Sequence, residues 1–171
     1  MNLISLCGPN NGISECPSFL GELVCALFKE EVYSAGLSVS GYFKDHTDQT
    51  TYLKSSTFLA DINNERPAKN LKYWENMKRL SKYVLVTALN DSTVIPLVSE
   101  SFGYWNWGED KTLISLRDSP AYLEDWIGLK TLDEQGKLVE LSYQGDHVRW
   151  SNEFWSQEIL PFFSDPKTEL I

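Results

Sequence analysis

The sequence predicts an α/β fold built on a mostly parallel sheet, and three observations carry that prediction. Residues 83–89 are apolar almost throughout, which is typical of a strand covered on both faces. Residues 138–143 form a second strand-like run. The expected order is strand, helical segment, strand, irregular segment, strand and helix, which is the alternation of α/β proteins.

The first 80 residues are expected to form one strand and several helices. Leu3–Leu6 is a short apolar run stopped by Gly8-Pro9, which indicates a buried strand that leaves through a turn. From Ser18 to Glu31 apolar residues recur with the period of an amphipathic helix. Residues 33–70 predict short helices and loops, and a further helix is expected from about Ala68 to Leu80.

A final helix is expected after Ser151, whose hydroxyl can cap the first turn. Its expected buried side consists of apolar residues at helical spacing: Phe154, Trp155, Ile159, Phe162 and Phe163.

Composition places the chain among globular proteins and excludes two classes of partner. Its 171 residues correspond to one domain, and 42% of them are hydrophobic, which is typical of a packed core. With 24 acidic and 15 basic residues, the net charge is −9. An acidic surface repels phosphate backbones and anionic lipid, so we expect neither nucleic acid nor a membrane surface as partner. No apolar run approaches the roughly 18 residues of a transmembrane segment.

The segment Met1–Gly8 lacks the basic leader and the small-residue cleavage site of a secretory signal peptide. Two interpretations follow from that segment. Either the protein is cytoplasmic, or the first part of a longer chain is missing. A strand that begins at the second residue favours a missing part.

The sequence does not decide whether its three cysteines are reduced or form a disulfide. They are Cys7, Cys16 and Cys25. They lack the Cys-x-x-Cys spacing of a zinc site. A bridge between Cys16 and Cys25 requires a bend, because a continuous helix rises about 1.5 Å per residue and would hold them apart. The alternative is three reduced thiols within a core.

Asp91 and His147 each follow a predicted strand, where the carboxyl ends of a parallel sheet form sites. A nucleophilic serine needs an imidazole base, and the imidazole needs a carboxylate that orients it. The order Asp and then His is that of α/β-hydrolases, in which the serine comes earlier. A turn-forming Asp and a loop His are the alternative interpretation of the same residues.

The nucleophile elbow Gly-x-Ser-x-Gly is absent from the sequence. The segment Gly36–Gly41 contains two serines but has one residue too many, so neither is expected to be a nucleophile. The other histidine, His46, lies among polar residues and is expected in a solvated loop.

Several segments resemble the palmitoyl-protein thioesterases, most closely the plant-like members. Leu89–Ser92 is similar to the family's segment with the triad aspartate, and Gly145–His147 to that with the triad histidine. The likeness runs in the family's order over residues 2 to about 163. The remaining segments that carry it are Ser56–Arg66, Pro96, Phe102–Tyr104, Tyr122, Glu124–Lys130 and Ile159–Phe162.

This resemblance implies the C-terminal part of an α/β-hydrolase fold. Residues 1–171 would be a single incomplete domain, with a helical cap-like insertion at about 9–80 and a core segment at about 83–163. The family hydrolyses the thioester between palmitate and protein cysteines in the lysosome, without a cofactor or metal. A palmitoylated protein or fatty acyl thioester would therefore be the substrate, in the lysosome or secretory pathway.

The resemblance also assigns individual residues. Asp91 would orient His147, which would act as general base and later as general acid. Cys16 and Cys25 fall where the family has a bridged pair, although here one residue further apart. Asn90 begins an Asn-Asp-Ser glycosylation sequon like the one beside the family's triad aspartate.

The absence of the family's nucleophile elbow from this chain leaves three hypotheses open. The chain begins just past the position of the family's elbow, so the serine and the oxyanion-hole amides are expected upstream. The chain is then a truncated product or incomplete gene model that is inactive alone. It is otherwise a non-catalytic acyl-binding or regulatory remnant. The third hypothesis is that the chain does not fold alone, because loss of the N-terminal half leaves Leu3–Leu6 as an unpaired apolar edge strand. Poor solubility, or pairing with a chain that supplies the N-terminal half, would then be expected.

Overall fold

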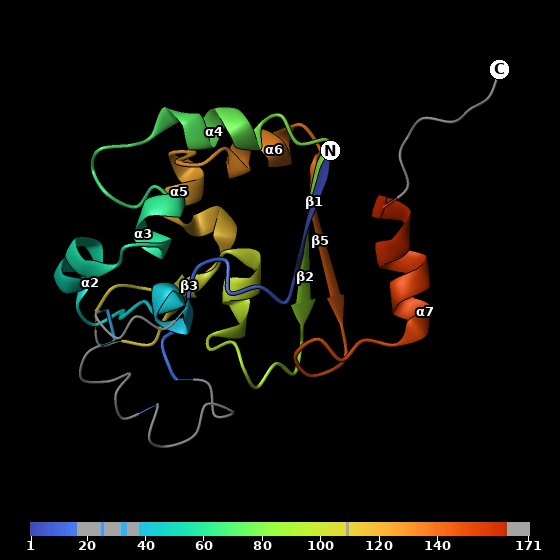
Figure 1. Cartoon of the computed structure of the whole chain (residues 1–171), viewed down its shortest axis with the longest axis horizontal. Coiled ribbons are helices and arrows are strands. Elements are labelled where there is room, and N and C mark those ends of the chain that lie inside the picture. Colours follow the sequence, from blue (N-terminus) through green and yellow to red (C-terminus); the bar gives the residue numbers. More distant parts are fainter. Residues whose placement is uncertain (17–24, 26–31, 34–37, 109, 164–171) are drawn as a thin grey trace.

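A computed structural model describes residues 1–16, 25, 32–33, 38–108 and 110–163. Three parallel strands form a sheet in the order β1 (Asn2–Leu6), β2 (Lys82–Ala88) and β5 (Leu138–Tyr143). The two strand ranges expected at 83–89 and 138–143 agree with β2 and β5. The predicted α/β class with a parallel sheet is confirmed (Figure 1).

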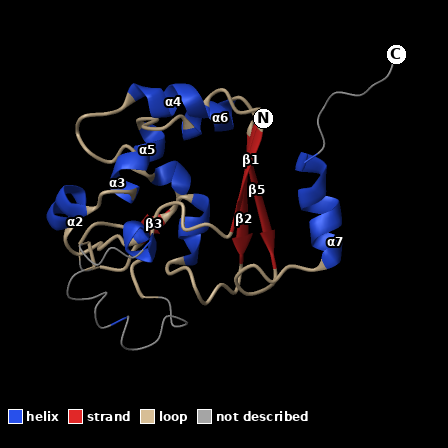
Figure 2. Cartoon of the chain, viewed as in Figure 1, coloured by secondary structure: helices blue, strands red, loops and turns tan. Residues whose placement is uncertain are grey.

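Short helices and the loops between them make up the rest of the described chain (Figure 2). A two-stranded antiparallel sheet, β3 (Tyr104–Trp105) with β4 (Leu113–Ile114), lies between β2 and β5 in the sequence. Within the described residues, no helix is both long and apolar enough to span a membrane. The helices are η2 (Ser38–Tyr42), α2 (Gln49–Ser55), α3 (Leu59–Ile62), α4 (Leu71–Met77), η3 (Leu97–Ser101), η4 (Leu116–Asp118), α5 (Pro120–Leu123), α6 (Leu129–Glu134), α7 (Asn152–Phe154), η5 (Trp155–Ile159) and η6 (Leu160–Phe163).

The central strand β2 divides two apolar clusters between its faces. Tyr83 and Leu85 belong to a cluster with α6, with Leu116 of η4 and with Phe102. Val84 and Val86 pack against the helical segment that follows β5. Alternate side chains of a strand point to opposite faces, and here both faces are covered. This double burial is why the strand reads as a continuous apolar run.

β1 is a partly exposed strand, and the expectation of a buried strand at Leu3–Leu6 was wrong. Ile4 and Leu6 pack into the cluster beneath α7, but Leu3 on the other face is 41% exposed. Within the described residues, β2 is the strand partner of β1. The side chains of β1 are therefore less buried than those of β2, because no strand lies at the second edge of β1 within the described residues.

Helices α2, α3 and α4 fall within the 9–80 range expected to be helical. α4 is shorter than the helix expected from Ala68 to Leu80, because the Asn70 side chain accepts the amide hydrogen of Lys72 and starts the helix there. The helix expected from Ser18 to Glu31 lies outside the described residues except at Cys25.

Two expectations about single residues were wrong. His46 is buried, not solvated, because its ring packs 6.2 Å from the Trp105 ring and its carbonyl accepts the amide hydrogen of Gly108. Phe163 is 60% exposed at the end of the final helical segment. Ser151 caps that segment as expected, but the helix then widens to a π-helix and tightens to a 3-10 helix, which changes the side that Phe163 presents.

Candidate active site

Asp91 follows β2 and is held by its own loop. Its Oδ1 accepts the amide hydrogens of Thr93 at 2.6 Å and Val94 at 2.8 Å, an Asx turn closed by the side chain. The Asp91 side chain is fully buried. These two bonds fix the orientation of the carboxylate, and its second oxygen, Oδ2, can accept a hydrogen bond from another residue.

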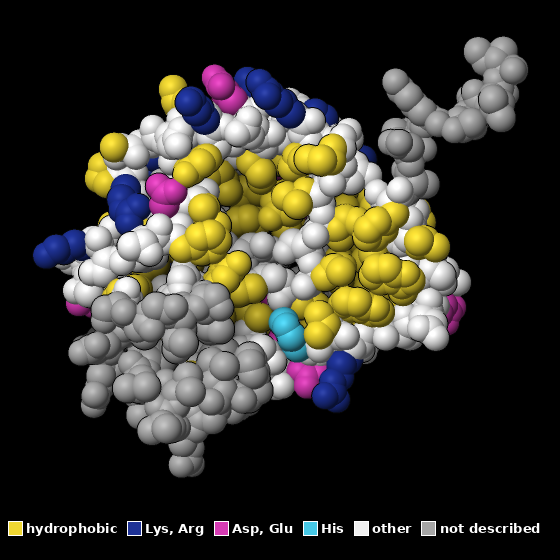
Figure 3. Space-filling view, viewed as in Figure 1, with side chains coloured by type: hydrophobic (Ala, Val, Ile, Leu, Met, Phe, Trp, Pro, Cys, Tyr) yellow, Lys and Arg dark blue, Asp and Glu magenta, His cyan; other side chains and the backbone are white. Residues whose placement is uncertain are grey.

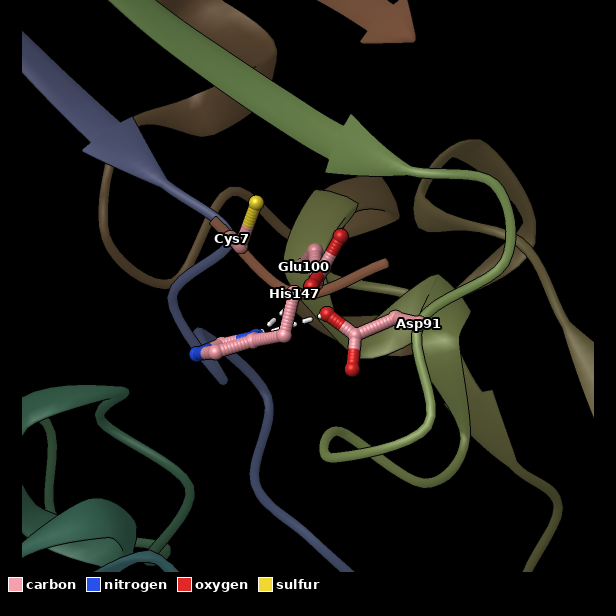
Figure 4. Close-up of side chains that lie close together, drawn as sticks. All are labelled: Cys7, Asp91, Glu100 and His147. Atoms are coloured by element: carbon pink, nitrogen blue, oxygen red, sulfur yellow. Dashed lines mark hydrogen bonds and ion pairs between the residues drawn. The ribbon is translucent and has the colours of Figure 1, made fainter. Parts of the chain in front are cut away.

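His147 follows β5 and provides that partner. Its Nδ1 lies 2.7 Å from Asp91 Oδ2. The His147 side chain is 29% exposed, and in Figure 4 its second ring nitrogen points away from Asp91. Gly145 allows the tight approach of this loop, since a Cβ atom there would lie 2.7 Å from both the Arg149 carbonyl oxygen and the Tyr143 ring. The structure thus brings together the two residues that sequence reasoning singled out.

Asp146 ties the loops of Asp91 and His147 together. Its Oδ1 accepts hydrogen bonds from the Ser92 amide and the Ser92 hydroxyl, both at 2.9 Å, and from the His147 amide at 2.8 Å. These bonds lower the pKa of the exposed Asp146 carboxyl. Sequence reasoning treated Asp146 only as a neighbour of His147 and missed this linking role.

The electrostatics of Asp91 favour its ionised form. Burial acts to raise the pKa of Asp91, but hydrogen bonds outweigh it and hold that pKa below the ordinary value. The bonds come from the Glu100 side chain, the Val94 amide, the His147 ring and the Thr93 amide. A carboxylate that stays ionised can fix the tautomer of the imidazole beside it.

Glu100, in η3, is a member of the site that sequence reasoning missed. Its side chain is fully buried, and its Oε2 accepts the amide hydrogen of Ala88 at 2.8 Å. Burial, followed by a hydrogen bond with Asp91, raises the pKa of Glu100 to about 9. The only available sequence signal was its place between Pro96 and Gly103, within the segment that resembles the family.

Cys7, which follows β1, completes a cluster of four side chains whose ligand atoms lie within 4.8 Å of one another (Figure 4). These residue types can bind a divalent metal, but the 2.7 Å between Asp91 and His147 is shorter than the roughly 3.3 Å between two zinc ligands. Cys7 Sγ also lies 3.3 Å from the Tyr143 hydroxyl. The geometry therefore fits hydrogen bonds between these groups better than a metal ion.

The remaining predicted residues are not members of this cluster. Cys16 and Cys25 form a disulfide, the pairing that the family resemblance implied. Asn90 is exposed beside Asp91. In the segment 36–41, Ser40 is buried and residues 36–37 lie outside the described part.

Two adjoining apolar pockets lie between helices and strands. Figure 3 shows hydrophobic side chains gathered over the middle of one face of the molecule. The pockets share Asn63, Phe102 and Ile127. One of them is also lined by Asn10, whose side-chain amide donates to the Glu100 carbonyl oxygen at 2.7 Å. Asn10 therefore links this apolar pocket to the backbone beneath the Asp91–His147 pair.

Comparison with known proteins gives one consistent family. Residues 1–147 match the family model described as palmitoyl protein thioesterase. The chain is 38% identical over 141 residues to palmitoyl-protein thioesterase 3 of Dictyostelium discoideum, covering 80% of this chain and 49% of that protein.

Two further relatives agree with that match. Palmitoyl-protein thioesterase 1 of Caenorhabditis elegans is 31% identical over 157 residues, which is 86% of this chain and 52% of the relative. Lysosomal thioesterase PPT2 of Mus musculus is 35% identical over 115 residues, which is 66% of this chain and 37% of the relative. The chain thus spans about half the length, or less, of the curated relatives it matches.

Proposed function

Because this chain belongs to the palmitoyl protein thioesterase family, we propose that Asp91 is the orienting carboxylate, and His147 the general base, of a thioester hydrolase. The substrate is a thioester between palmitate and a protein cysteine, as the names of the relatives suggest. His147 takes the proton of a serine hydroxyl, and Asp91 orients the ring and stabilises its charged form. His147 then donates that proton to the leaving thiolate.

The 2.7 Å contact between His147 Nδ1 and Asp91 Oδ2 is the observation that carries this proposal. An imidazole bound to a buried carboxylate through Nδ1 leaves Nε2 free to accept a proton, which is the arrangement of a serine triad. The direction of the ring in Figure 4 fits a nucleophile on the side away from Asp91.

The serine and the oxyanion-hole amides are proposed to lie outside these 171 residues, on the same chain or on a partner chain. The sequence has no Gly-x-Ser-x-Gly elbow. β1 supports this proposal, since one of its edges has no strand partner among the described residues, where Leu3 is exposed, and a further strand can pair there. We expect the 171-residue chain to be inactive alone for this reason.

The acyl chain of the substrate is proposed to enter the apolar pocket that Asn10 borders. Its apolar lining includes Leu59, Ile62 and Met77 from the segment between β1 and β2, together with Phe102 and Ile127. Apolar pockets of this kind gain free energy by removing a hydrocarbon chain from water. No cofactor is required for hydrolysis through a serine.

The compartment is proposed to be the lysosome or another part of the secretory pathway. Several relatives, among them that of Mus musculus, are named lysosomal thioesterases, and the Cys16–Cys25 disulfide is typical of oxidising compartments. Asn90 is exposed in an Asn-Asp-Ser sequon and would carry a glycan there. A shift in mass on treatment with an N-glycosidase tests this, and its absence would favour the cytoplasmic alternative.

Hydrolysis of a palmitoyl-cysteine peptide tests the proposed activity. We expect no turnover by the chain alone. We expect turnover when the part of the Dictyostelium relative that this chain does not match, where we propose that the serine lies, is joined upstream. His147→Ala should lower that turnover by about 10³-fold or more, while Gln144→Ala, an exposed change in the same loop, should leave it intact. Turnover that is unaffected by His147→Ala contradicts the proposal.

A non-catalytic acyl-binding protein is the second candidate, favoured by an apolar pocket in a chain that has no elbow. It predicts that a palmitoyl ligand binds the chain alone and that His147→Ala leaves the Kd unchanged. Turnover by the joined protein that depends on His147 would rule this candidate out.

A further inference from the structure

Glu100 lies behind the Asp91–His147 pair with one oxygen that has no donor. Its Oε2 accepts the Ala88 amide hydrogen at 2.8 Å. No group among the described residues donates to Oε1, which is buried. An ionised carboxylate in that position would leave an acceptor unsatisfied, at a large cost in free energy.

The groups that face Glu100 do not include a lysine or arginine within the described residues. They are Asp91 beyond β2, His147 and Tyr143 from β5 and its loop, and Cys7 beyond β1. His147 Nδ1 lies 3.9 Å from Glu100 Oε1, which is too long for a hydrogen bond, and it already contacts Asp91. Asp91 and Glu100 bring carboxylate oxygens within 4.8 Å of each other. Two buried carboxyl groups that lie so close do not both ionise, so they share one proton.

We propose that Glu100 is a neutral carboxylic acid whose Oε1–H donates a hydrogen bond to Asp91, making Glu100 the residue that positions the triad carboxylate. The Asp91 carboxylate then receives bonds from two backbone amides, from His147 and from Glu100, and so holds one orientation. Because Glu100 carries no charge, it orients Asp91 without adding a second negative charge beside the His147 ring. Its importance for catalysis rests on the proposed function, but its protonation does not.

The proton belongs to Glu100 and not to Asp91 because the two environments differ. Glu100 accepts a single amide hydrogen, whereas Asp91 accepts two and also contacts His147. Hydrogen bonds to the charged form favour ionisation, and burial without them opposes it. The pKa of Glu100, raised to about 9 mainly by burial, supports this assignment.

NMR titration of the His147 ring in the full chain tests the charge of Glu100. Glu100→Gln keeps both the donor and the acceptor of a neutral acid, so the pH midpoint of the ring should move by less than about 0.3 unit. If Glu100 were ionised 3.9 Å from the ring, the same change would remove a negative charge and lower the midpoint by about one unit or more. That drop would overturn the proposal.

Glu100→Leu tests the hydrogen bond, because it removes the donor at similar volume. The Asp91 carboxylate then loses a stabilising partner, and the midpoint of the His147 ring should rise by about half a unit to one unit. If the His147 ring has the same pH midpoint in Glu100→Leu as in Glu100→Gln, the proposed hydrogen bond from Glu100 to Asp91 is refuted. In the joined protein, Glu100→Leu should lower kcat and shift its pH profile at constant KM, and Glu100→Gln should restore both.

A measurement on the unaltered chain keeps the test independent of variant folding. The carboxyl carbon of Glu100, followed by ¹³C NMR, should show the neutral form at pH 7 and ionise only toward pH 9. An ionised carboxyl at pH 7 would overturn the proposal. These measurements need no turnover, so loss of the proposed thioesterase function would not be mistaken for a failure of this one.

Discussion

The pH dependence of folding stability should carry a signature of Glu100. Glutamate in the unfolded chain ionises near pH 4.5, whereas burial, followed by the bond with Asp91, raises the pKa of Glu100 to about 9 in the folded chain. Between these values the folded chain binds one more proton than the unfolded chain. The contribution of Glu100 to stability is therefore largest below pH 4.5 and falls as the pH rises toward 9.

Glu100→Gln should remove this loss, since glutamine does not titrate. Each pH unit well above 4.5 costs the wild-type chain about 1.4 kcal/mol, which amounts to about 4 kcal/mol between pH 5 and pH 8. Glu100 is fully buried, so solvent screening does not reduce this figure.

Urea unfolding at pH 5 and pH 8 measures the difference. From pH 5 to pH 8, the free energy of unfolding should fall by about 4 kcal/mol more in the wild-type chain than in the Glu100→Gln variant. The effects of other titrating groups largely cancel in that comparison. Glu134→Gln, an exposed change of the same chemistry at the end of α6, should retain the wild-type dependence. A Glu100→Gln variant with the full wild-type pH dependence would refute the account of Glu100.

Three further outcomes are expected. Asp91→Asn should lower kcat of the joined protein by about 10³–10⁴-fold with little change in KM, measured by steady-state kinetics; a loss under tenfold would argue against a triad. Asp146→Ala should speed amide hydrogen exchange at Ser92 and His147, because both amides donate to its carboxylate; unchanged protection there would contradict the linking role. Leu85→Ala should lower the free energy of unfolding by about 2–5 kcal/mol because its side chain is fully buried in β2, and a urea curve that does not shift would count against the packing described for that strand.

Most of the fold could be predicted because its signals are local. The continuous apolar run of β2 reflects cover on both faces, and the Ser151 cap marks the final helical segment. The apolar run of β1 alone indicates a buried strand, and its exposure was expected only from the resemblance, which implies missing neighbours, since strand order depends on contacts between distant segments. The burial of His46 depends likewise on Trp105, which lies far along the chain.

The site could be predicted only in part. Asp91 and His147 stand at strand ends, where the sheet geometry itself suggests chemistry. Glu100 lies in a polar stretch beside two serines, which usually indicates an exposed turn, and only the fold places it under Asp91. Asp146 could not be distinguished from an ordinary loop residue, because its bonds to Ser92 join loops from separate strands.

Labelling with a serine-directed fluorophosphonate probe, followed by peptide mass spectrometry, tests most directly whether His147 serves a nucleophile outside these residues. In the joined protein, the label should fall on a serine of the added part, within the elbow that we propose to lie there, and be lost in His147→Ala. Labelling of a serine within the 171 residues, or labelling of the elbow serine that survives His147→Ala, would contradict the account.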